Sequence, residues 1–316
     1  MSNFYYDWDQ RITDPVWVTI GNFDGVHLGH QSLISQLIAK ARSEHVNSLA
    51  VTFWPHPREF FTKEFVGFYL NNSQEKNFLL EKTGLDNVLS LDFNSELANL
   101  DAAQFLEKLS EIAPLRGLMV GERFAMGKDR QGNETVVREV CNSIGIPCIH
   151  IKPLQIGGKV VSSQKIREAL KLGDLDLVTR YLGRTYSLSG RVAHGKKTGS
   201  KLGFPTANLY FDERRQLPKY GIYATRVEVN GRLYQGVTNV GIRPTFDDGN
   251  SPSVETLLLD FDDMIYNKLI HVNFIHFLRE EKKFDRISDL VEQIEQDKKE
   301  ARRILKNGIQ SPYLPT

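Results

Sequence analysis

The first half of the chain alternates short apolar runs with amphipathic helical patterns, and this alternation constrains the fold more than any other feature. The runs at 17–23, 48–54, 88–93, 117–121 and 148–153 are typical of strands, and helical patterns at 30–45, 73–83, 101–112 and 134–144 separate them. Strands that alternate with helices predict βαβ units and a parallel sheet, the Rossmann-like α/β class. A helical pair broken at Gly173 is predicted to close this half over 162–183.

The pattern changes from Tyr186 onward, where short alternating segments are separated by glycine and proline. Asn230-Gly231 between two such segments is a strong hairpin signal. Many short strands with turn residues between them predict a small antiparallel β-barrel, and the apolar spacing of 286–306 predicts a final helix. We therefore expect two domains, 1–183 and 184–316, each long enough for its own core.

Composition and charge exclude several classes of protein. The 316 residues are 41% hydrophobic and 25% charged, a globular balance, and the net charge of +1 is too small for a chain-wide nucleic-acid binder. Cys141 and Cys148 form neither a disulfide framework nor a CxxC metal motif, so we expect two reduced thiols. The polar N-terminus is no secretory signal and no apolar run approaches the roughly 18 residues of a membrane span. We expect a cytoplasmic protein without membrane or nucleic-acid partners; the sequence does not decide self-association.

The most informative motif is the segment 21–30, Gly-Asn-Phe-Asp-Gly-Val-His-Leu-Gly-His, where a predicted strand runs into a glycine-rich turn that opens a helix. This arrangement directs backbone N–H groups and the positive helix end at an anion, and Gly25 and Gly29 allow a phosphate to approach the backbone. His27 and His30 share one face of a helical first turn and are placed to donate hydrogen bonds to phosphate oxygens. The alternatives are an ordinary turn with two surface histidines, or a metal pair, which would need a third ligand.

Two further segments of the first half have weaker signals. The segment 52–57, Thr-Phe-Trp-Pro-His-Pro, ends a predicted buried strand, where open α/β sheets bind ligands, although by itself it also fits a rigid loop. Ser162 and Ser163 are good helix N-caps, with Arg167 near the first turn. Hydroxyls, a helix N-terminus and an arginine together are typical of a phosphate site. Taken in isolation, the same motif also fits a helix that is merely capped.

The second half offers a phosphate cradle, cation ligands and a base. The glycine- and lysine-rich loop 194–201 is able to fold over a polyphosphate, or is a hairpin loop with solvated lysines. Thr206 and Asn208 in Gly-Phe-Pro-Thr-Ala-Asn supply oxygen ligands for a hard cation such as Mg²⁺. The segment 239–246 is interpreted as a turn-rich connector, and Glu255 is expected at the start of the next strand. Glu255 becomes a candidate base if a substrate hydroxyl reaches it, and otherwise is an edge charge.

Taken together, these motifs resemble the bifunctional prokaryotic riboflavin kinase/FMN adenylyltransferase (FAD synthetase) family, over roughly residues 16–306. The N-terminal part is similar to the nucleotidyltransferase superfamily with its HxGH and ISSTxIR motifs, and the C-terminal part to the riboflavin kinase barrel. The resemblance implies that His27, His30, Ser163 and Arg167 handle the ATP triphosphate and that Asp24, His56 and Pro57 line the FMN side.

For the kinase half, the resemblance implies that Thr206 and Asn208 bind Mg²⁺–ATP and that Glu255 orients or deprotonates the 5′-hydroxyl of riboflavin. The substrates implied are ATP, riboflavin and FMN. The full set of expected nucleotide- and flavin-binding residues is Gly21, Phe23, Asp24, Gly25, Gly29, His56, Pro57, Ser163, Arg167, Gly195, Lys201, Gly203, Pro205, Thr206 and Asn208.

The chain departs from the family pattern at three positions of the first half. Arg123 stands where Asp or Asn is usual, Met126 where an aromatic residue is usual, and Gln164 replaces the Thr of ISSTxIR. An arginine donates hydrogen bonds but accepts none, so it changes how a nucleotide is held. These departures leave open a riboflavin kinase with an impaired adenylyltransferase half. A flavin-binding regulator without catalysis is a separate alternative.

Overall fold

The computed structural model describes residues 1–62, 65–128, 131–193, 203–244 and 250–306. The chain folds as two compact units, one of Met1–Phe65 with Tyr69–Ser163, the other of Val66–Phe68 with Gln164–Thr316. In the part of the chain that the structure describes, no helix has the length and apolar character to cross a membrane.

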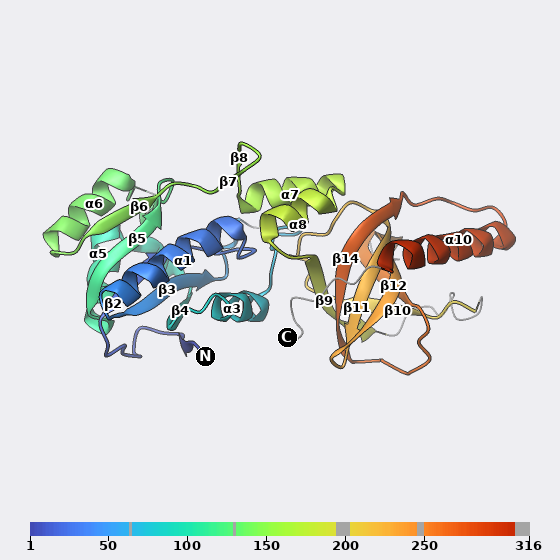
Figure 1. Cartoon of the computed structure of the whole chain (residues 1–316), viewed down its shortest axis with the longest axis horizontal. Helices are drawn as coiled ribbons and strands as arrows, with labels where there is room; N and C mark the ends of the chain where they lie inside the picture. Colours follow the sequence, from blue (N-terminus) through green and yellow to red (C-terminus); the bar gives the residue numbers. More distant parts are fainter. Residues whose placement is uncertain (63–64, 129–130, 194–202, 245–249, 307–316) are drawn as a thin grey trace. The chain divides into compact units, whose positions relative to one another are not determined.

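The first unit is built on a six-stranded sheet in which every neighbouring pair is parallel, in the order β1-β4-β3-β2-β5-β6. The predicted Rossmann-like alternation is confirmed (Figure 1). Each of its longer strands lies within a few residues of the run that predicted it. The strands are β1 (Asn3–Tyr5), β2 (Val16–Ile20), β3 (Asn47–Trp54), β4 (Asn87–Asp92), β5 (Leu115–Gly121) and β6 (Cys148–Ile151).

Helices cover both faces of this sheet because successive strand residues point to opposite sides. Val16, Val18 and Ile20 pack with the helices of one face, and Trp17 between them packs with those of the other. The first face carries α5 (Ala102–Ile112) and α6 (Glu134–Ser143), and the second carries α1 (Leu28–Ser43) and α3 (Ser73–Glu81). Short elements complete the unit: α2 (Pro57–Phe60), α4 (Ser95–Asn99), β7 (Gln155–Ile156) and β8 (Lys159–Val160).

The second unit contains the predicted helical pair, a closed antiparallel barrel and a final helix. Gly173, at φ +77°, separates α7 (Ser163–Leu172) from α8 (Leu175–Leu182), as predicted. The hairpin at Asn230-Gly231 is also confirmed, with positive φ at both residues. The barrel order is β10-β13-β12-β11-β14-β9, with β9 (Tyr186–Ala193), β10 (Thr206–Tyr210), β11 (Gly221–Val229), β12 (Arg232–Pro244), β13 (Asn250–Leu258) and β14 (Leu269–Arg279).

Helix α10 (Ile287–Leu305) packs on the outer face of the barrel, against Ala224, Val237 and Leu257. Thr225, Thr238 and Thr256 are the sequence neighbours of these three residues, point to the inside of the barrel and form a buried chain of three hydroxyls. Thr238 lies 2.8 Å from Thr225 and 2.9 Å from Thr256 between hydroxyl oxygens, and all three side chains are fully buried.

Two sequence interpretations of this unit were wrong. The segment 239–246 is not a turn-rich connector as far as the structure describes it, because Asn239–Pro244 continues strand β12. Glu255 does not begin its strand but lies inside β13, which starts at Asn250. The pairing of β12 with β13 runs from Gly236–Leu258 to Pro244–Asn250, so main-chain hydrogen bonds hold this segment despite its proline and glycine.

Candidate functional sites

The glycine-rich turn of the first unit lies at the topological switch point of the sheet. The chain leaves β2 toward β3 on one side, whereas β5 pairs with β2 on the other. Ligands of open α/β sheets bind at the carboxyl ends of strands at such a point. Strand β2 ends at Ile20, so Gly21–His30 follows directly at this edge and opens α1.

The two histidines of the turn contact one another. Their rings stack with centroids 3.6 Å apart and an angle of 17° between the planes. His27 is the N-cap of α1, and its Nδ1 accepts a hydrogen bond from the His30 N–H at 3.2 Å, which places the proton of a neutral His27 ring on Nε2. The side chain of His27 is buried, so the alternative of two surface histidines does not hold.

Close packing and backbone conformation explain three residues of the turn that have no reactive group. Phe23 is buried, has φ +48° and contacts the ring of His30 edge-on at 5.2 Å. A Cβ on Gly29 would lie 3.0 Å from the ring of His27, so a larger residue requires the imidazole to move by a few tenths of an ångström. Gly25 has φ +86°, where a side chain is strained. The turn is thus built around the position of the two imidazoles.

Asp24 connects the turn to two distant segments. Its carboxylate Oδ1 accepts a hydrogen bond from the Leu70 N–H at 2.9 Å, and its main-chain oxygen accepts one from the Ser163 hydroxyl at 2.8 Å. The structure therefore brings Ser163 of the third motif to the glycine-rich turn, 139 residues away in sequence.

The segment after β3 forms a short, capped turn. His56 is the N-cap of α2, with its Nδ1 accepting from the Arg58 N–H at 3.0 Å, and Pro57 is the first residue of the helix. The His56 N–H donates to the Tyr69 hydroxyl at 2.6 Å, and the Tyr69 ring stacks on Trp54 with centroids 4.5 Å apart. The turn that carries His56 is therefore anchored to Tyr69 and Trp54.

Arg167 belongs to the second unit, where its guanidinium lies 3.7 Å above the ring of Phe68. Its Nε donates to the Phe68 carbonyl at 2.7 Å. Phe68 in turn donates its N–H to the Arg214 carbonyl at 2.7 Å. The side chain is therefore held by a segment of the first half of the sequence that packs with the second unit.

Ordinary structural roles account for two of the three departures from the family pattern. Met126 is buried and packs in the core with α5 and α6. Gln164 donates to Glu168 one helical turn on, at 3.0 Å. Arg123 is exposed and follows β5 at the ligand edge of the sheet.

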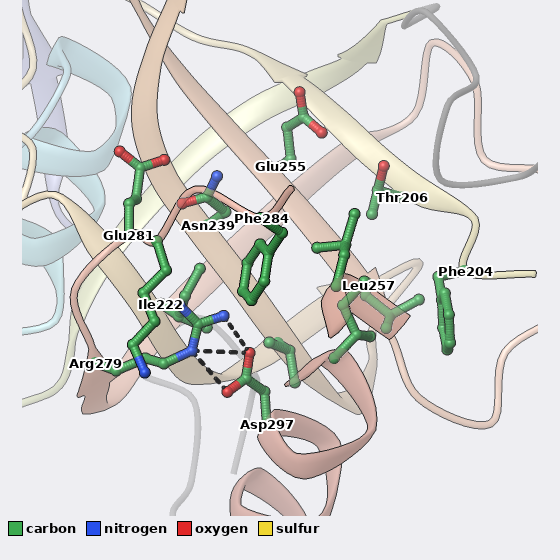
Figure 2. Close-up of a pocket in the computed structure, with 14 residues that line it drawn as sticks. Phe204, Thr206, Ile222, Asn239, Glu255, Leu257, Arg279, Glu281, Phe284 and Asp297 are labelled. Carbon is green, nitrogen blue, oxygen red and sulfur yellow. Dashed lines mark hydrogen bonds and ion pairs between the residues drawn. The ribbon is translucent and has the colours of Figure 1, made fainter. Parts of the chain in front are cut away.

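A cavity of about 420 Å³ lies in the second unit between the outer barrel face and α10 (Figure 2). This volume is within the range of small-molecule sites. Figure 2 shows Glu255, Thr206 and Asn239 toward one end and the ion pair of Arg279 with Asp297 toward the other. Apolar side chains make up much of the remaining wall, among them Phe204, Ile222, Val237, Leu257, Phe284, Leu290 and Ile294.

Strand register places the polar residues of this cavity on one face. Glu255 of β13 is paired with Asn208 of β10 on one side and with Asn239 of β12 on the other. Thr206 is paired with Leu257 in the same way. Directly paired residues share a face of the sheet, so a carboxylate, a hydroxyl and two amides lie together.

The other predicted binding residues of this half are placed only in part. Gly203, at φ +84°, and Pro205 lead into β10 on either side of Phe204, which lines the cavity. Gly195 and Lys201, in the lysine-rich loop, lie outside the described residues.

Sequence patterns missed several residues at these sites. Lys76 is buried beneath the glycine-rich turn, although a lysine in an amphipathic helix is expected at the surface. Asn239 was not predicted as a cavity residue because its segment, 239–246, was interpreted as a connector. The Arg279–Asp297 pair joins positions 18 residues apart, and only the packing of α10 on β14 brings them together.

Both halves of the chain match models of known families. Residues 9–165 match FAD synthetase, and residues 182–305 match riboflavin kinase. The bifunctional riboflavin kinase/FMN adenylyltransferase of Pseudomonas fluorescens is 37% identical over 90% of this chain and 92% of its own length. The chain belongs to the bifunctional riboflavin kinase/FMN adenylyltransferase family. The predicted family and the order of its two parts are confirmed.

Other members of this family are similarly close. The Bacillus subtilis protein of the same name is 34% identical over 92% of both chains. A solved structure described as a macrolide-efflux protein from Streptococcus pneumoniae is 26% identical, with a TM-score of 0.85 over 95% of this chain and 98% of its own.

Proposed function

We propose that the chain is a transferase with two successive ATP-dependent activities. Residues 184–316 phosphorylate riboflavin to FMN, and residues 1–183 adenylylate FMN to FAD with release of pyrophosphate. Family membership of both halves supports this proposal. The observation that carries the kinase activity is the row Asn208–Glu255–Asn239, of which Glu255 and Asn239 line the cavity of the barrel, since phosphoryl transfer to a hydroxyl uses a carboxylate that positions or deprotonates that hydroxyl.

In the kinase half, Glu255 accepts or orients the proton of the riboflavin 5′-hydroxyl. The Thr206 hydroxyl and Asn208 amide oxygen are hard donors on the face that carries Glu255, so these residues fit Mg²⁺ as it accompanies ATP. The ion neutralises charge on the phosphates when bound. The apolar wall of the cavity matches a flat aromatic ring system, and the polar end a hydroxylated chain.

In the adenylyltransferase half, the phosphate of FMN attacks the α-phosphorus of ATP. This nucleophile is already anionic, so catalysis consists of positioning and charge stabilisation. His27 and His30 donate to the phosphates at the N-terminus of α1, and Ser163 and Arg167 contribute from the third motif. His56, Pro57 and Asp24 belong to the FMN side.

The small-molecule substrates are the only partners we assign, and a cytoplasmic enzyme agrees with the use of ATP. The decisive test is product analysis with riboflavin and Mg²⁺–ATP, and separately with FMN and Mg²⁺–ATP. We expect FMN and FAD in the first reaction and FAD in the second. FMN without FAD in both would favour the impaired-adenylyltransferase alternative, and tight flavin binding without ATP consumption would favour a regulator.

Single substitutions separate the two sites. Glu255→Gln should abolish FMN formation from riboflavin and leave adenylylation of supplied FMN. His30→Ala should have the opposite effect. Loss of both activities in either variant would contradict two separate sites.

A further inference from the structure

Lys76 is a buried lysine whose ammonium group contacts no carboxylate of the described residues. It lies on α3, is 3% exposed, and its Nζ donates to the Phe53 carbonyl at 2.7 Å, the Thr52 hydroxyl at 3.0 Å and the Asn22 carbonyl at 3.4 Å. Three donors meet three oxygens, which uses the full capacity of an ammonium group. Within the described parts of the chain, Lys76 has no ion pair.

The three oxygens belong to the two segments that carry the first site. Asn22 is in the glycine-rich turn after β2, between Gly21 and the residues Asp24 and His27. Thr52 and Phe53 end β3, just before the turn that carries His56. The Thr52 hydroxyl also donates to the Asn22 carbonyl at 3.2 Å, so Lys76 completes a small polar network between the ends of adjacent strands.

The surroundings of Lys76 disfavour its charge. Burial lowers the pKa of Lys76 to about 8, and the charge of Asp24 opposes this shift only in part. On α3 the neighbouring Glu75 uses its carboxylate to cap the Asn72 N–H. Beyond the two oxygens of β3, the ammonium faces the indole of Trp54, with Nζ 5.6 Å from the ring centroid, and Tyr69 and His56 lie behind that ring.

A buried cation without a carboxylate is costly, and an aliphatic side chain would fill the same space without that cost. Its retention at the ligand edge of the sheet therefore calls for a role that needs the charge. An anion bound at the turn would supply the missing opposite charge, since buried charges interact over several ångströms in a medium of low dielectric.

We propose that Lys76 is a positioning residue of the adenylyltransferase site: its ammonium ties the turn that carries Asp24 and His27 to the loop that carries His56, and its charge favours binding of the anionic nucleotides. This inference rests on the proposed function of the first unit. The residue touches no reacting atom, because its three donors are used within the protein.

Two kinetic consequences distinguish this role from a merely structural one. Loss of the proton removes one donor and the charge, so the kcat/KM of adenylylation should fall about tenfold per pH unit above pH 8. A bound anion raises the pKa of a nearby ammonium, so the fall in kcat should begin at higher pH than the fall in kcat/KM. The pH profile of riboflavin phosphorylation by the same sample should show neither of these two decreases, which are the alkaline limbs of the adenylylation profiles.

The experiment measures FMN adenylylation and riboflavin phosphorylation by the full chain from pH 6.5 to 9.5, in the wild type and in the variants Lys76→Arg and Lys76→Met. We expect Lys76→Arg to lack the limb near pH 8, because arginine stays charged, and Lys76→Met to lose about 10- to 100-fold in kcat/KM at pH 7. Lys82→Met, on the exposed end of the same helix, is the control and should behave as the wild type.

The outcomes are decisive in both directions. Persistence of the limb in Lys76→Arg, or full activity of Lys76→Met, overturns the inference. If Lys76→Met fails to fold, the wild-type and Lys76→Arg profiles alone decide. A wild type that forms FMN but no FAD at pH 7 refutes the proposed function itself, whereas FAD formation that is indifferent to both substitutions refutes only the role of Lys76.

Discussion

The ion pair under the barrel cavity offers a quantitative test of how the second unit is held together. Arg279 at the end of β14 donates from Nε and Nη2 to both carboxylate oxygens of Asp297 on α10, at 2.7–3.2 Å. The side chains are 16% and 7% exposed. The substitution Arg279→Met keeps an unbranched apolar side chain but leaves the carboxylate, among the described residues, with Gln293 as its remaining side-chain donor, at 3.1 Å.

The expected cost follows from this burial. Removing one partner of a buried pair costs about 3–5 kcal/mol, because the other charge stays buried without compensation. The remaining hydrogen bond from Gln293 places the cost at about 3 kcal/mol, the lower end of this range. For a domain of this size that corresponds to a decrease of about 6–12 °C in the midpoint of thermal unfolding.

Thermal unfolding followed by circular dichroism gives the measurement. All three tryptophans of the chain, Trp8, Trp17 and Trp54, lie in the first unit, so their fluorescence is an internal reference for that unit. The matched control is Arg302→Met, which breaks an exposed bidentate pair of the same helix with Asp260 and should change little.

The double variant Arg279→Met/Asp297→Leu completes the design, because replacing both partners by apolar groups removes the uncompensated charge. It should recover most of the lost stability. A single variant that loses less than about 1 kcal/mol, or a double variant no more stable than the single one, would refute this account of the pair.

Three further predictions concern other parts of the chain. Gly29→Ala should reduce FAD formation and spare FMN formation, since its Cβ would displace the ring of His27; equal loss of both in the product assay would contradict this. Thr238→Val should cost the second unit about 1–3 kcal/mol in urea unfolding, because it leaves two buried hydroxyls without their common partner, and an unchanged midpoint would refute this. Burial lowers the pKa of Lys76 to about 8, against 10.5 in the unfolded chain, so the unfolded state binds more protons between these values and stability rises with pH. Between pH 7 and 10 the first unit should gain about 2–3 kcal/mol more in the wild type than in Lys76→Met, as judged by urea titration with tryptophan fluorescence.

Local patterns were sufficient for the scaffold and for the motifs. The strand–helix alternation of the first half and the Asn230-Gly231 hairpin depend on periodicity and turn chemistry, which are written in neighbouring residues. The contact of His27 with His30 was predictable for the same reason, because both belong to one helical turn. Strand β1 was missed because three residues are too few to show a period.

Features that depend on packing between distant segments were not predictable. The Pro244 and Gly241 signals indicated a turn, but pairing with β13 holds this segment as a strand. A lysine in a helix is normally solvated, and nothing near Lys76 in the sequence shows that two strand ends would cover it. The sequence shows only a lysine in the first turns of a predicted helix, with the apolar residues of that helix after it.

The packing of residues 66–68 affects how the two activities could be separated genetically. Gly67 and Phe68 donate their N–H groups to the carbonyls of Glu213 and Arg214, and Phe68 also holds Arg167. A gene truncated after residue 163 would encode a first half without Arg167. A gene truncated after residue 183 would keep Arg167, but Gly67 and Phe68 would lose the carbonyls that accept their N–H hydrogen bonds. An isolated adenylyltransferase half of 183 residues should therefore exchange these two amide protons rapidly with solvent, so the intact polypeptide is a better-ordered source of this site than its own N-terminal fragment.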